Sequence, residues 1–162
     1  MKGIPVAFQR RCLTTKKRKA LVPLIREKAQ KISYGRAEVE EIDELNILRA
    51  TMLAMERAVD GLGDVDEKIQ IDGNQIPDGL EGRAEAVIGG DGLVSAISAA
   101  SILAKVARDE EMAVLSEIYP GYGLEAHAGY ATKLHIEALE LMGVTPIHRR
   151  SFGPVRRILE RA

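Results

Sequence analysis

The sequence lacks the features of an exported or membrane-bound protein. Cys12 is the only cysteine among 162 residues, which excludes a disulfide within the chain and suits a reducing cytosol. The first residues, MKGIPVAFQRR, lack the apolar stretch of a signal peptide, and no apolar run is long enough to span a bilayer. These absences predict a cytoplasmic protein with no membrane partner.

Internal repeats and low-complexity linkers are absent as well. The length therefore predicts a single domain over residues 1–162, and a hydrophobic share of 46% permits a real core. The net charge of −1 gives no indication of a polyanionic partner. Basic residues nevertheless cluster within 10–19 and 149–157, and acidic residues within 38–44. Each run taken alone is typical of a solvated face.

Hydrophobic spacing of about 3.6 residues predicts most of the chain to be helical. The expected helices cover residues 14–31, 46–59, 94–108 and 131–142, with 109–118 either continuing the third or starting another. Pro23 predicts a kink or a break in the first helix. Asp43 or Asn46 is expected to cap the second, and Gly143 to end the fourth. Pro154 is expected at the start of a last short helix.

Three short segments have the pattern of strands. Residues 31–39, KISYGRAEV, alternate in the way that a half-buried strand does. Residues 67–72 place Ile69 and Ile71 on one face before a turn at Gly73. Residues 86–88 form a short apolar run that ends at two glycines. Strands followed by turns and helices predict an α/β fold.

Two aspartates follow two of these predicted strands. Asp72 and Asp91 each lie just past a strand end, 19 residues apart. In open α/β sheets, ligands bind beyond the carboxyl ends of the strands, and hard divalent cations prefer carboxylate oxygens. The alternative is that both aspartates only form turns beside glycine, which is a common use. The small residues in 95–104 predict a closely packed helix. Its expected role is to hold the edge of the sheet at which Asp91 lies.

Several successive segments resemble bacterial ribonuclease HII. They read SYGRAEVEEIDELNILRATMLAMERAV, IDGNQIP, GGDGLVSAISAASILAKVARDEEM, YPGYGLEAHAGYATKLHIEAL and PIHRRSFGPVRRIL. The resemblance runs in order over residues 13–162 and leaves 1–12 unmatched. It implies a ribonuclease H-like fold, incomplete at the N-terminus, with a helical C-terminal part. It also implies endonucleolytic cleavage of RNA in RNA–DNA hybrids or of ribonucleotides embedded in duplex DNA, by two-metal phosphodiester hydrolysis with Mn²⁺ or Mg²⁺ as cofactor.

The resemblance assigns roles to five residues. Asp72 and Asp91 match aspartates that are catalytic and bind metal, although Asp91 stands in Gly-Gly-Asp-Gly where the family has Lys-Gly-Asp-Ser. Tyr130 matches the tyrosine that contacts the ribose, and Arg149 and Arg150 match a basic pair expected on phosphates. The spacing of the three histidines is not typical of a metal site, so we interpret them as structural or phosphate-adjacent.

The family site holds four carboxylates, and the resemblance places two of them on a strand with an Asp-Glu-x-Gly-Arg-Gly pattern. This sequence has no such pattern. Whether Asp43, Glu44 or Asp109 replaces the missing acids is left open. Three alternatives follow: a ribonuclease HII with weakened activity, a non-catalytic hybrid-binding remnant, and a fragment without function. An absent central strand would also leave an open sheet edge, through which self-association is expected.

Overall fold

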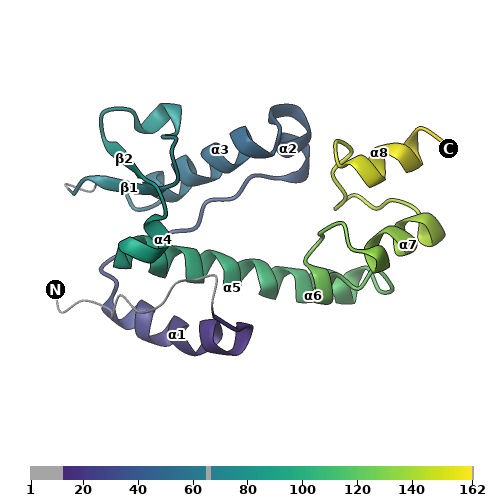
Figure 1. Ribbon diagram of the computed structural model, residues 1–162, viewed down its shortest axis with the longest axis horizontal. Coiled ribbons are helices and arrows are strands. Elements are labelled where there is room, and N and C mark those ends of the chain that lie inside the picture. Colours follow the sequence, from purple (N-terminus) through teal and green to yellow (C-terminus); the bar gives the residue numbers. More distant parts are fainter. Residues whose placement is uncertain (1–12, 65–66, 162) are drawn as a thin grey trace. The chain divides into compact units, whose positions relative to one another are not determined.

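The computed structural model describes residues 13–64 and 67–161 (Figure 1). The chain divides into two compact units. Unit 1 comprises the residues up to Arg36 together with Met52–Val106, and unit 2 comprises Ala37–Thr51 and the residues from Ala107 onward. No helix of the described ranges is both long and apolar enough to cross a membrane.

The fold is α/β, as predicted, with many helices and one short parallel sheet. In chain order its elements are α1 (Thr15–Lys28), α2 (Val39–Leu45), α3 (Ile47–Asp60), β1 (Ile69–Asp72), the 3₁₀ helix η2 (Asp78–Leu80), β2 (Ala84–Val87), α4 (Gly90–Leu93), α5 (Ser95–Ile118), α6 (Leu124–His127), α7 (Lys133–Met142) and α8 (Gly153–Leu159).

The two strands of unit 1 run parallel and side by side (Figure 1). Their register pairs Ile69 with Ala84 at one end and Asp72 with Val87 at the other. Ile71 and Ala84 turn inward and pack with Val59 and Leu80 in a small hydrophobic core. This packing fixes which face of each strand is buried, and it leaves Asp72 exposed at the strand end.

A second core of unit 1 joins α1 to the first half of α5 (Figure 1). Ile25 of α1 packs against Ile102, Leu103 and Val106. Helix α1 is continuous through Pro23, so the alternative of a break there is wrong. This packing along α5 stabilises the helix in spite of the proline, since tertiary contacts supply most helical stability in proteins.

The strand predicted over residues 31–39 is wrong: residues 29–38 contain no strand, and Val39 begins α2. Ile32 and Tyr34 are exposed, and the smaller Ser33 and Gly35 face inward instead. A Cβ at Gly35 would overlap the backbone of α3 at Ala54. The alternation in the sequence therefore comes from an extended segment laid closely on a helix, rather than from pairing with a strand.

Unit 2 has its own core, formed by residues from the second half of α5 to α8. Its buried members are Met112, Tyr122, Leu124, Ala138, Leu139 and Val155. The hydroxyl of Tyr122 donates a hydrogen bond of 2.9 Å to the carbonyl of Gly143, just after α7. Thr132 caps the start of α7, because its side chain accepts from the backbone N–H of His135 at 3.3 Å.

The helix boundaries confirm several predictions and correct others. Asn46 caps α3 by accepting from the backbone N–H groups of Leu48 and Arg49, at 3.0 and 3.2 Å. Gly143, at φ 83°, ends α7, and Pro154 lies in the first turn of α8. Residues 109–118 continue α5 and do not start a new helix. The short helix α2 was not predicted; it carries a capping box of Glu38 and Glu41.

Candidate active site

Asp72 is the last residue of β1, and the register places it opposite Val87 at the end of β2. The backbone N–H of Gly73 donates to the carbonyl of Val87 at 3.0 Å, so the two strands remain paired up to this point. The side chain of Asp72 is exposed at the carboxyl end of the parallel pair. This is the position at which open α/β sheets bind ligands.

The chain returns to Asp72 through the two glycines after β2. Gly89 adopts a left-handed conformation, with φ 67°, and Gly90 begins α4. A Cβ added to the buried Gly90 would lie 3.4 Å from Asp72 Oδ1 and 2.5 Å from Ile97 Cδ1. The absence of a side chain therefore lets the turn before Asp91 pack closely on Ile97 of α5, and it leaves Gly90 beside the carboxylate of Asp72.

Asp91 follows Gly90 in the first turn of α4 and is half-buried. Its backbone carbonyl accepts a hydrogen bond from the hydroxyl of Ser98 on α5, which fixes the turn against that helix. Asp72 and Asp91 thus both belong to unit 1, at the same end of the strand pair. The small-residue helix α5 holds the rim that carries Asp91, as the sequence indicated.

Two carboxylates on neighbouring segments fit a hard divalent cation, which prefers oxygen ligands. Within residues 13–64 and 67–161, no three His, Cys, Asp or Glu side chains gather in a geometry that could hold a metal. The described site therefore supplies two carboxylate ligands at most, and water or substrate oxygens would complete the coordination of a cation there.

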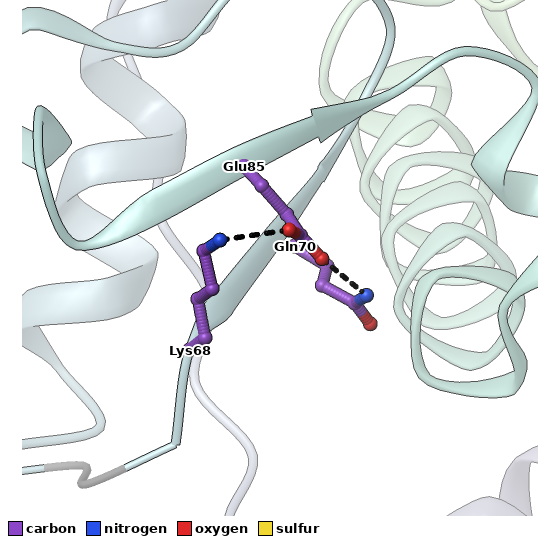
Figure 2. Close-up of polar contacts among 3 residues, drawn as sticks. All are labelled: Lys68, Gln70 and Glu85. Carbon is purple, nitrogen blue, oxygen red and sulfur yellow. Dashed lines mark hydrogen bonds and ion pairs between the residues drawn. The ribbon is translucent and has the colours of Figure 1, made fainter.

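Polar contacts also join the segment that leads to Asp72 to β2. Lys68 forms an ion pair of 2.9 Å with Glu85 of β2, and Gln70 donates to the same carboxylate at 2.9 Å (Figure 2). Hydrogen bonds from Lys68 and then Gln70 lower the pKa of Glu85. Because all three side chains are on the surface, these contacts contribute little to stability.

Tyr130 lies in unit 2, and its side chain is 72% exposed. Its backbone is held on both sides. The N–H of Tyr130 donates to the carbonyl of His127 at 2.9 Å, and its carbonyl accepts from the N–H of Thr132 at 2.8 Å. The preceding Ala128 and Gly129 are both left-handed, with φ 50° and 82°. An exposed aromatic ring is thus carried on a constrained turn.

The basic pair also lies in unit 2 and is anchored through its backbone. The N–H groups of Arg150 and Ser151 donate to the two carboxylate oxygens of Asp43, at 2.7 and 2.8 Å, and the Ser151 hydroxyl donates at 2.5 Å. Burial acts to raise the pKa of Asp43, but the Ser151 and Arg150 hydrogen bonds and the Arg149 charge outweigh it and lower the pKa. Arg149 lies over the Phe152 ring at 5.5 Å.

Asp43 is one of the acids considered as replacement ligands. Asp43 uses both carboxylate oxygens in the anchor just described. Glu44 and Asp109, the other two acids considered, belong to unit 2.

The three histidines are buried together in unit 2. His127 stacks on His135 with ring centroids 4.5 Å apart, and the Nε2 atoms of His135 and His148 are 3.2 Å apart. Sequence reasoning missed this cluster, because separations of 8 and 13 residues are not typical of a metal site.

Comparison with known proteins identifies the family. The family model described as ribonuclease HII matches residues 11–155. This chain belongs to the ribonuclease HII family. A ribonuclease HII from Marinomonas sp. (strain MWYL1) is 58% identical over 148 residues, which cover 91% of this chain and 74% of the relative. Another, from Laribacter hongkongensis (strain HLHK9), is 57% identical and covers 91% and 75%.

The fold has a matching solved structure. The crystal structure of the ribonuclease H2 from Pyrococcus horikoshii OT3 superposes with a TM-score of 0.73 over 93% of this chain and 79% of that one, at 24% identity. The ribonuclease H-like fold implied by the resemblance is thereby confirmed. Ribonuclease HII enzymes are endonucleases that act on RNA–DNA hybrids and use divalent metal ions.

The predicted site residues fall into two sets. The structure brings Asp72 and Asp91 to one strand end in unit 1, and it places Tyr130, Arg149 and Arg150 in unit 2. Their roles in ribonuclease HII chemistry remain predictions. Sequence reasoning did not identify Gly90 as the residue that packs closely on Ile97, or Asp43 as an anchor. For Gly90 the Gly-Gly-Asp run was a signal, while for Asp43 nothing in the sequence marked a partner 107 residues away.

Proposed function

We propose that this member of the ribonuclease HII family cleaves the RNA strand of RNA–DNA hybrids, and duplex DNA at embedded ribonucleotides, by phosphodiester hydrolysis with Mn²⁺ or Mg²⁺. The observation that supports this most directly is the position of Gly90, the residue before Asp91, beside the exposed carboxylate of Asp72. A nuclease with these substrates would act in the cytoplasm, where bacterial DNA lies.

In this proposal Asp72 and Asp91 are the carboxylates that hold the cation. A divalent cation bound there stabilises negative charge on the phosphate and lowers the pKa of water. The residues of the chain fix the geometry: strand pairing directs Asp72 outward, Gly90 packs on Ile97 beside it, and Ser98 holds the Asp91 turn. Two carboxylates offset less positive charge than four, so cleavage should be slower than by a relative that has all four.

Contacts with the nucleic acid are assigned to unit 2. The exposed Tyr130 ring is suited to contact the ribose, whose 2′-hydroxyl distinguishes RNA from DNA. Arg149 and Arg150 are suited to phosphates, which bind arginine through charge and forked hydrogen bonds. The backbone at Tyr130 and at the arginine pair is already held by hydrogen bonds. Binding of a nucleic acid would therefore need little further ordering of the backbone there.

A cleavage assay tests the proposal. A labelled RNA–DNA hybrid is incubated with the purified protein and Mn²⁺ or Mg²⁺, and Asp72→Asn and Asp91→Asn are compared with Asp60→Asn. Asp60 is an exposed aspartate at the end of α3 in the same unit, so it serves as the control for general loss of charge. We expect metal-dependent cleavage that the first two variants abolish and the control retains. Cleavage that survives both Asp72→Asn and Asp91→Asn would refute the assignment.

A non-catalytic hybrid-binding protein is the second candidate function, motivated by the two carboxylates without a third. Membership of a nuclease family favours cleavage over it. Binding of the hybrid by the wild-type protein, with no cleavage at any concentration of either metal, would decide for this alternative.

A further inference from the structure

A chain of hydrogen bonds runs through the buried histidines of unit 2 and ends at the backbone of Tyr130. His148 Nδ1 accepts the backbone N–H of Thr145 at 3.1 Å and lies 2.8 Å from the Thr145 hydroxyl. His148 Nε2 is 3.2 Å from His135 Nε2, and His135 Nδ1 is 2.9 Å from the carbonyl oxygen of Tyr130. Each link is within hydrogen-bond distance.

The backbone groups at both ends fix the direction of this chain. A backbone N–H only donates, so His148 Nδ1 carries no proton, and the neutral ring has its proton on Nε2. That proton is donated to His135 Nε2, which leaves the His135 proton on Nδ1. A carbonyl only accepts, and the His135 Nδ1–H accordingly donates to the carbonyl of Tyr130.

His127 is fixed by the same logic. The backbone N–H of Gly129 donates to His127 Nδ1 at 3.2 Å, so the ring proton is on Nε2 and is donated to the carbonyl of Tyr122 at 2.7 Å. All six ring nitrogens of His127, His135 and His148 therefore have a partner in the neutral state. No lone pair is left for a metal, which excludes a histidine metal site here.

The environment supports neutral rings. Burial, followed by the proximity of His135, lowers the pKa of His148 to about 4, and burial also lowers the pKa of His135. A second proton on His148 would face the backbone N–H of Thr145, and one on His135 would face the proton of His148. A positive charge on either ring would therefore disrupt this chain of hydrogen bonds.

We propose that His135 and His148 are positioning residues for Tyr130: the hydrogen-bond chain from Thr145 holds the Tyr130 carbonyl and thereby the direction of its exposed ring. The inference depends on the proposed role of Tyr130 at the ribose. Core histidines that only fill space would not need a matched donor and acceptor at every link. Here the chain of hydrogen bonds ends at Tyr130, which follows the left-handed residues Ala128 and Gly129 and has a side chain that is 72% exposed.

The tautomers are the first test, and they require no nucleic acid. In the wild-type protein, ¹⁵N NMR of the imidazoles at neutral pH should show the proton on Nε2 of His148 and on Nδ1 of His135. A proton on Nε2 of His135 would overturn the inference, whatever the activity of the protein.

The second test separates positioning from packing. His135→Phe keeps an aromatic ring but removes both hydrogen bonds, His135→Asn retains a donor near Nδ1, and Phe152→Leu alters packing against His135 without removing a hydrogen bond. Amide hydrogen exchange should become faster at Tyr130 and Thr132 in His135→Phe, less so in His135→Asn, and not in Phe152→Leu. Equal effects of His135→Phe and Phe152→Leu would overturn the inference.

Binding gives the third readout. The preference for an RNA–DNA hybrid over duplex DNA of the same sequence should fall about tenfold in His135→Phe, within the range for one aromatic stacking contact. In a Tyr130→Ala background the same change should have no further effect, because His135 acts through Tyr130. Additive effects would overturn the inference. A wild-type protein with no preference would refute the proposed function, while the exchange test would still decide the positioning role.

Discussion

At the scale of single residues, the carboxylate site depends on a small number of oxygen ligands. Asp72 and Asp91 supply them, and in the described part of the chain no third acid forms a metal-competent group with them. Calorimetric titration with Mn²⁺ should therefore show one weak site, which Asp72→Asn removes and Asp60→Asn retains. Two tight sites would contradict this and would show that other acids complete the coordination.

His148 predicts a defined pH dependence of stability. Its pKa is about 4 in the folded protein, against an ordinary value of 6.5. Between these values the unfolded chain binds a proton that the folded chain does not, so stability should fall as the pH is lowered from 6.5 to 4. The loss is on the order of 3 kcal/mol at most. Denaturant unfolding at several pH values measures it, and His148→Gln should flatten the profile. A wild-type stability that stays constant over this range would contradict the shift.

Tyr130 and the arginine pair should affect binding in different ways. Tyr130→Ala should weaken hybrid binding by about 1–3 kcal/mol, the range for stacking on an aromatic ring. Arg149→Ala and Arg150→Ala should instead reduce the dependence of affinity on salt, since each phosphate contact releases about one counterion. Fluorescence anisotropy at several salt concentrations measures both. An unchanged affinity of Tyr130→Ala for hybrid and DNA alike would exclude the ribose contact.

At the scale of elements, the anchor between α2 and the segment before α8 stabilises unit 2. Asp43→Ala removes the acceptor for the Arg150 and Ser151 N–H groups and should cost about 1–2 kcal/mol of unfolding free energy. Glu44→Ala, at an exposed position of the same helix, is the matched control and should cost much less. Thermal unfolding of both variants checks this; equal losses would show that the anchor contributes nothing specific.

The elements also show what sequence patterns can and cannot predict. Long amphipathic helices such as α3 and α7 were predictable, since periodicity and the caps at Asn46 and Gly143 agree. The segment 29–38 was not, because alternation does not reveal whether a chain pairs with a strand or lies on a helix. At the site, the strand ends carrying Asp72 and Asp91 were predictable from local pattern. The Asp43 anchor and the histidine chain were not, because they join residues far apart in sequence.

At the scale of the whole molecule, the described sheet leaves one edge of each strand unpaired. The described residues form a sheet of two strands only, and Ile88 and Leu93 beside it are 77% and 67% exposed. Unpaired edges and exposed apolar side chains recruit other chains. We expect the purified protein to self-associate. Light scattering after size-exclusion chromatography should show a smaller oligomer for Ile88→Lys than for the control Leu141→Lys, which changes a residue exposed on α7 in unit 2. A monodisperse wild-type monomer would contradict this.

The Asp43 anchor has a consequence for synthesis on the ribosome. All residues of unit 1 have been made once Val106 is added to the chain. Asp43 gains its hydrogen-bond donors only when Arg150 and Ser151 have been made. At typical translation rates this delay is on the order of seconds. During it, α2 has been made but Asp43 lacks its hydrogen-bond donors, so we expect this acidic segment to be accessible to chaperones and proteases in the nascent chain.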